Sequence, residues 1–194
     1  YFVGRNGTAK SRTAKSIASA LAEGGRLLST DRLIGIMGID RYSHIAAPSR
    51  FKGPPVDSSE RDQILSEPQF KALGTSELYA LRDDPVVLMR VAAFIQRTLK
   101  RRIEMRDTAG YVDPFVVTAQ GEYSLLRDEG HGLRELVILL AAIYREDWAV
   151  LVVDEPELHL HPSMARLWVG ELNRVCARTN RRAIVVSHEP AFLR

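Results

Sequence analysis

The sequence has few of the features that would assign it to a membrane or to an oxidising compartment. No apolar run among its 194 residues approaches the roughly 20 residues needed to span a bilayer. Its one cysteine, Cys176, excludes an internal disulfide and fits a reducing compartment, so we expect a cytoplasmic protein. The net charge is also small. A value of +3 permits contact with nucleic acid but does not require it.

The remaining composition is that of an ordinary globular protein, with 45% hydrophobic and 26% charged residues. The length suits one substantial domain over residues 1–194, and we expect a helical or loop insert within it at residues 40–103. Residues 1–3 read as the tail of a strand that runs straight into a glycine turn. We therefore expect the chain to be a piece of a longer protein.

The hydrophobic pattern predicts alternating elements. Residues 1–23 read as strand, glycine turn and helix, residues 27–28 and 33–37 as short strands, and residues 47–62 as an exposed loop. A helix is predicted over residues 85–102 and a hairpin over residues 115–126, turning at Gln120 and Gly121. Further helices are predicted at residues 133–146 and 163–178, and buried strands at 148–153 and 182–187. Such alternation predicts an α/β fold with a mainly parallel sheet flanked by helices.

A glycine-rich turn leads into the first predicted helix. Backbone N–H groups of such a turn can surround a phosphate, and the positive end of the helix points at it. Lys10 would add a charge between the β- and γ-phosphates, and the Ser11 hydroxyl could ligate Mg²⁺. The candidate nucleotide-binding residues are Gly4, Arg5, Asn6, Gly7, Thr8, Ala9, Lys10, Ser11 and Arg12.

Two features leave this loop ambiguous when it is taken alone. Ala9 stands where a glycine is usual, so a plain turn before a helix with a surface lysine is an equal alternative. We expect Ala9 to have negative φ, where a methyl group is tolerated. Thr-Ala-Lys-Ser also occurs twice, but Lys15 lies more than a helical turn beyond Lys10 and would be carried away from the phosphates.

Two buried strands each end in polar residues. The strand before Asp154 and Glu155 would deliver a Mg²⁺ ligand, Asp154, and a carboxylate, Glu155, that orients or deprotonates the attacking water. The strand before Ser187 and His188 would bring His188 to the γ-phosphate and the same water. The alternatives are two solvated acids in a turn and a structural histidine, and the phosphate loop upstream favours the catalytic interpretation.

The order of these motifs resembles the ATP-binding-cassette (ABC) ATPase superfamily. Residues 155–162, Glu-Pro-Glu-Leu-His-Leu-His-Pro, resemble its non-transporter branch, which includes OLD-type, RecF-type and related AAA-like ATPases of DNA repair and phage defence. The resemblance implies a P-loop NTPase fold of the ABC-ATPase type, ATP and Mg²⁺ as cofactors, and ATP hydrolysis. It also implies a second ATPase head as partner, in a homodimer or with a paralogue. ATP binding and hydrolysis would then be coupled to DNA, a nuclease or another effector.

The resemblance further implies a signature segment that caps the nucleotide of the second head. Gly130, His131 and Gly132 stand in that place, before a helix, although no serine precedes Gly130. No glutamine stands in residues 26–61, where such ATPases place one for Mg²⁺. Two alternatives remain: the nucleotide-binding domain of a transporter, and an ATP sensor without turnover.

Some residue types suggest other sites. His159 and His161 with Glu157 have the chemistry of a zinc site. The run nevertheless matches the loop that follows the Asp-Glu pair in the resembled family, and we expect it at a dimer interface and without metal. The arginine-rich helix ends are read as solvated surface.

Overall fold

The computed structural model describes residues 2–3, 10–21, 24–30, 32, 75–108 and 111–189. Four parallel strands form the central sheet, in the order β1 (Phe2–Val3), β7 (Arg182–Ser187), β6 (Val150–Asp154) and β2 (Gly25–Leu28). Strands adjacent in space are far apart in sequence, so the connections cross over the sheet and cover it with helices.

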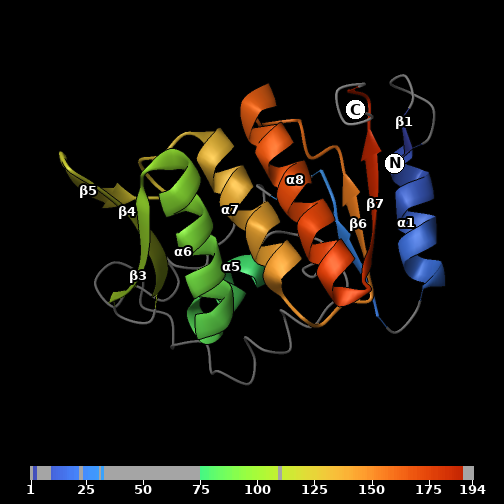
Figure 1. Cartoon of the computed structure of the whole chain (residues 1–194), viewed down its shortest axis with the longest axis horizontal. Coiled ribbons are helices and arrows are strands. Elements are labelled where there is room, and N and C mark those ends of the chain that lie inside the picture. Colours follow the sequence, from blue (N-terminus) through green and yellow to red (C-terminus); the bar gives the residue numbers. More distant parts are fainter. Residues whose placement is uncertain are drawn as a thin grey trace, which may run out of the picture.

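Both faces of this sheet are buried. Helix α1 (Lys10–Ala20) covers one face, and α7 (His131–Tyr144) and α8 (Pro162–Thr179) lie on the other (Figure 1). Side chains alternate between the two faces: Val152 and Val186 pack with Ala14 of α1, whereas Leu151 and Val153 join the core under α7 and α8. The predicted α/β fold with a parallel sheet flanked by helices is confirmed.

A second layer of structure lies beyond α7. It consists of α5 (Thr75–Asp83), α6 (Pro85–Leu99) and an antiparallel sheet of β3 (Arg102–Thr108), β4 (Tyr111–Thr118) and β5 (Gly121–Ser124). The predicted hairpin is the β4–β5 pair, in which Thr118 pairs with Gly121. The pattern did not predict β3 as its third strand.

The predicted helix over residues 85–102 is too long at its C-terminus. Asp84 caps α6, because its carboxylate accepts hydrogen bonds from the backbone N–H groups of Val86 and Val87. Lys100 has φ of 57°, a left-handed conformation that ends the helix, and Arg102 begins β3 instead. The helices predicted at 133–146 and 163–178 and the strand predicted at 182–187 are confirmed within about two residues, a normal uncertainty for helix ends.

The direction of α1 matters for the site. A Cβ on Gly25, at the start of β2, would come within 2.7 Å of the Leu21 Cβ, so the C-terminal end of α1 packs against the beginning of that strand. The N-terminal end of α1 consequently points to the opposite edge, where the parallel strands end. The predicted short strand at 27–28 falls in β2, whereas those predicted at 33–37 and the loop at 47–62 lie outside the described residues. None of the helices within the described ranges has the length and apolarity to cross a membrane.

Candidate active site

The four parallel strands end at one side of the sheet, which we call the carboxyl edge. Val3 pairs with Ser187, Asp154 pairs with Val186, and Val153 pairs with Leu28. Ligands of open α/β sheets bind at this side, because the strand ends and helix N-termini meet there. The predicted site residues on β6 and β7 therefore belong to one edge.

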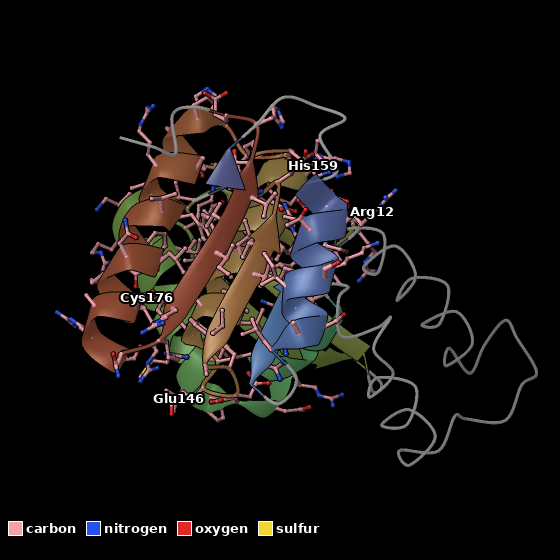
Figure 2. All side chains as sticks on the ribbon, turned by 90° about the vertical axis from the view of Figure 1, so that its right-hand side faces the viewer. Arg12, Glu146, His159 and Cys176 are labelled. Atoms are coloured by element: carbon pink, nitrogen blue, oxygen red, sulfur yellow. The ribbon has the colours of Figure 1, made fainter. Side chains whose placement is uncertain are left out.

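Helix α1 begins at the same edge. Lys10, Ser11 and Arg12 form its first turn, with Ser11 half-buried and Arg12 exposed. Figure 2 shows Arg12 and His159 toward the same end of the sheet and Glu146 at the opposite end. The partial positive charge at the N-terminus of α1 suits an anion. The remaining predicted loop residues, Gly4, Arg5, Asn6, Gly7, Thr8 and Ala9, lie outside the described residues, and so does the expected φ of Ala9.

Asp154 ends β6 and is almost completely buried, with 3% of its surface exposed. Its Oδ1 atom is buried and has no hydrogen-bond partner within the described part of the chain. An unpartnered buried carboxylate oxygen is costly, and a hard divalent cation that prefers oxygen ligands would compensate it. The buried Asp154 oxygen therefore fits Mg²⁺, and Ser11 as a second ligand stays a prediction.

The next residue, Glu155, has an unusual backbone. Its φ is 46°, a left-handed conformation that costs a non-glycine residue about 1–3 kcal/mol. Hydrogen bonds hold it there: its N–H donates to the Val186 carbonyl over 2.7 Å, and its carbonyl accepts from the Leu158 N–H over 3.2 Å. Strain of this kind collects at functional sites when the surroundings enforce it.

The carboxylate of Glu157 binds the end of β7. Its Oε1 accepts hydrogen bonds from the Ser187 hydroxyl at 2.5 Å and from the His188 backbone N–H at 3.0 Å. The Nδ1 of His188 lies 3.2 Å from Glu157 Oε1 and 3.6 Å from Glu155 Oε1. The two predicted catalytic residues, Glu155 and His188, are thus neighbours, and Glu157 fixes the backbone that carries the histidine.

The predicted signature segment opens α7. Gly130 is the N-cap without a side-chain cap, and its N–H donates to the Glu129 carboxylate over 3.0 Å. Glu129 also binds Arg101 at 2.8 Å and the Tyr123 hydroxyl at 2.5 Å, so an arginine balances the charge that would oppose a phosphate here. Burial and the hydrogen bond to Glu129 raise the pKa of Tyr123, which stays a neutral donor.

The start of α7 packs closely against residues 155–160, which we call the 155–160 turn. A Cβ on Gly132 would come within 3.2 Å of the His159 carbonyl oxygen, so only glycine allows this approach without adjustment. The rings of His131 and His159 lie 5.6 Å apart between centroids. Burial and the nearby charges of His131 and Arg32 lower the pKa of His159.

His161 serves as the N-cap of α8. Its Nδ1 accepts a hydrogen bond from the Ser163 N–H over 3.3 Å and lies 2.8 Å from the Ser163 hydroxyl. Within the described ranges there is no group of three or more His, Cys, Asp or Glu side chains arranged to hold a metal ion.

Arg32 lies behind the site, four residues beyond β2, and is fully buried. Its Nε donates to the Glu135 carboxylate of α7, its Nη1 donates to the carbonyls of Ser29 (2.8 Å) and Asp154 (2.7 Å), and its Nη2 donates to the Glu155 carbonyl (2.9 Å). Burial raises the pKa of Glu135, and the charge of Arg32 offsets only part of that rise.

The sequence reasoning missed Arg32, Glu135 and the binding role of Glu157. A signal existed for Glu135, because it is the one acidic residue of α7 and directly precedes the apolar run of residues 136–143. Nothing in the pattern distinguished Arg32 from a surface arginine, since its partners are 103 and 122 residues away.

Comparison with known proteins gives one family match and several distant structural ones. Residues 114–194 match the family described as "AAA domain, putative AbiEii toxin, Type IV TA system". This is less than half of the chain; it includes Asp154, Glu155 and His188 but not the predicted phosphate loop. No curated protein matches the sequence.

Two solved structures are similar in part. One, from work on the structural biochemistry of ATP-driven dimerization and DNA stimulated activation of SMC ATPases, has 8% identity and a TM-score of 0.49, with 60% of this chain and 76% of that chain covered. The other is an Smc head domain with an extended coiled coil bound to the C-terminal domain of ScpA from Pyrococcus furiosus. It has 10% identity and a TM-score of 0.46, and the match covers 95% of this chain and 48% of that one. Values this low say nothing about activity.

Proposed function

We propose that this chain is the head of an ATPase of the ABC type that binds ATP with Mg²⁺ and hydrolyses it. The phosphates bind at residues 4–11 and at the N-terminus of α1, with Lys10 between the β- and γ-phosphates. Ser11 and Asp154 hold Mg²⁺, which when bound neutralises phosphate charge. The OLD-type or RecF-type branch, suggested by residues 155–162, is part of the same proposal.

One observation carries the proposal. At the carboxyl edge, beside the N-terminus of α1, a buried carboxylate oxygen of Asp154 has no hydrogen-bond partner among the residues that the structure describes, while Glu155 and His188 lie within 3.6 Å of each other. A purely structural turn of solvated acids would not bury Asp154 at 3% exposure. Positioned carboxylates next to an anion-binding helix end are the requirements of phosphoryl transfer to water.

The chemistry follows from these positions. Glu155, whose side chain is 20% exposed, can reach solvent and accept a proton from the attacking water. The water oxygen forms a bond to the γ-phosphorus, and the bond from that phosphorus to the bridging oxygen of ADP breaks. His188 hydrogen-bonds the water or the γ-phosphate. Glu157 keeps the histidine backbone in place, and the rate enhancement arises from positioning and electrostatics.

The signature segment would bind the nucleotide of a second ATPase head. In this proposal Gly130, His131 and Gly132 cap the γ-phosphate of a nucleotide held by a second head, so ATP favours a dimer and hydrolysis reopens it. The same closure drives an attached DNA-processing or defence module. The glycine N-cap of α7, which carries no side-chain cap, leaves its N–H groups able to bind such an anion.

The test compares Glu155→Gln with Glu146→Gln in the full-length protein. Glu146 is exposed and lies at the opposite end of the sheet (Figure 2), so its variant controls for loss of a carboxylate as such. Loss of the general base should lower kcat about 100-fold or more, while ATP affinity is retained. With Mg²⁺ and ATP, Glu155→Gln should accumulate as a dimer, measured by light scattering.

Three results would contradict the proposal. The wild-type protein releases no phosphate with or without DNA, or Glu155→Gln turns over ATP as fast as the Glu146→Gln control, or ATP does not bind at all. Binding without turnover would instead favour the ATP sensor, and copurification with a membrane protein would favour the transporter domain.

A further inference from the structure

The buried pair of Arg32 and Glu135 is not needed by the hydrolysis scheme as it stands. Both side chains are fully buried, and Glu135 Oε2 has no hydrogen-bond partner among the described residues. An ion pair in such a place contributes less stability than apolar side chains of similar volume often would. Stability is therefore a weak reason for its presence, and its contacts suggest another.

The guanidinium binds the carbonyls of two consecutive peptide units, which flank the α-carbon of Glu155. It donates to the carbonyl of Asp154 over 2.7 Å and to the carbonyl of Glu155 over 2.9 Å. The planar arrangement of its N–H groups fixes the directions of both carbonyls at once, which an ammonium could not do. Since the left-handed φ of 46° at Glu155 lies between these carbonyls, Arg32 enforces the conformation that sets the direction of the Glu155 side chain.

The other end of the pair belongs to α7. Glu135 follows His131 by four residues, so both lie on the same face of the helix. Gly132 and His131 of the first turn also contact the 155–160 turn through His159. A displacement of the start of α7 therefore reaches Glu155 by two routes, one through the His159 contacts and one through Glu135 and Arg32.

We propose that Arg32 and Glu135 are positioning residues that hold Glu155 in its hydrolytic geometry and couple that geometry to the first turns of α7. This inference rests on the proposed function, and it adds a regulatory link to it. Binding of a second head's nucleotide at Gly130 and Gly132 adjusts α7, and the buried pair transmits the adjustment to the base of the same head.

The decisive variant is Arg32→Met with Glu135→Met in the full-length protein. It removes both buried charges together, so the fold is retained, but the carbonyls of Asp154 and Glu155 lose their donors. The control is Arg26→Met with Glu77→Met, an Arg–Glu pair where β2 begins, in which Glu77 is buried and the largely buried Arg26 also binds Asp147 at 3.3 Å. Measurements are thermal unfolding, ATP affinity, kcat, and hydrogen exchange of peptides that cover the 155–160 turn.

We expect the Arg32/Glu135 double variant to keep its ATP affinity and to lose kcat about 100-fold, because a displacement of about 1 Å costs that much. Its 155–160 turn should exchange faster than in the control, which should keep wild-type kcat. Arg32→Lys keeps the charge but not the planar donors, and it should show the same loss of kcat. It therefore serves as the test if the double variant does not fold.

The hydrogen-exchange measurement separates this inference from the proposed function. If the wild type has no turnover while the double variant alone loosens the turn, the proposed function is wrong, and only the part of the inference that concerns the backbone of the 155–160 turn stands. If exchange in the turn equals that of the control, or if Arg32→Lys and the double variant keep wild-type kcat, the positioning role is refuted.

Discussion

Replacing Glu157 by alanine should destabilise the protein and displace His188. The carboxylate accepts two hydrogen bonds, from the Ser187 hydroxyl and the His188 N–H, and its side chain is 9% exposed. Hydrogen bonds to a buried charged group contribute about 1.5–3 kcal/mol each. Together the two bonds contribute about 3–6 kcal/mol, and removal of Oε2, which has no partner among the described residues, returns about 1–3 kcal/mol, so the net loss should lie near the middle of the difference, at about 2.5 kcal/mol. The fully buried Ser187 would keep the Glu189 N–H as donor but lose its own acceptor.

The assay is urea unfolding of Glu157→Ala, Glu157→Gln and the exposed control Glu146→Ala. Glutamine keeps an oxygen acceptor in nearly the same place, so it should recover at least half of the loss. The control should stay within about 0.5 kcal/mol of wild type, as exposed charges do. In phosphate-release assays, kcat should fall in the same order as stability. Equal midpoints for wild type and Glu157→Ala would refute the reasoning.

Two further predictions concern the nucleotide and pH. Lys10→Ala should abolish ATP binding measured by calorimetry, whereas Lys15→Ala, exposed on α1, should leave it unchanged, and the reverse result would disprove the assignment of the loop. Burial and the charge of His131 lower the pKa of His159 from 6.5, so the stability it contributes is present above that value and is lost as the pH falls through the lowered pKa. The free-energy advantage of wild type over His159→Asn should therefore shrink between about pH 8 and about pH 5 in urea titrations, and His131→Asn should weaken this dependence.

The sheet could be predicted from the sequence because its signals are local. The apolar run before Asp154 and the run before Ser187 have the continuous hydrophobicity of strands buried on both faces, and they form β6 and β7. β3 could not be predicted in the same way. Charged residues of β3 such as Arg106 lie partly exposed on a peripheral sheet, so the segment lacks a buried strand pattern. Only Arg101 and Lys100, which has a left-handed conformation, separate it from α6.

The candidate site also combines features that the sequence predicts with features that it does not. Strand ends predicted the meeting of Glu155 with His188, since parallel strands deliver their last residues to one edge. The Arg32 contacts depend on folding, because four hydrogen bonds converge from three separate segments. The backbone conformation of Glu155 could not be predicted from the sequence either, because glutamate is not among the residue types that favour positive φ.

Among the residues that the structure describes, the two faces of the parallel sheet carry cores of very different size. On the side of α1, the fully buried residues in the described ranges are Ala14, Val152 and Val186, with a few partly buried neighbours, whereas the core on the α7 and α8 side extends through α6 to the antiparallel sheet. Opening a layer costs free energy in proportion to the apolar surface it exposes. We therefore expect α1 to be the layer that opens at the lowest free energy. An anion bound at the N-terminus of α1 should raise the free energy needed to open this layer by the free energy of binding, so the ligand stabilises the least stable part of the fold.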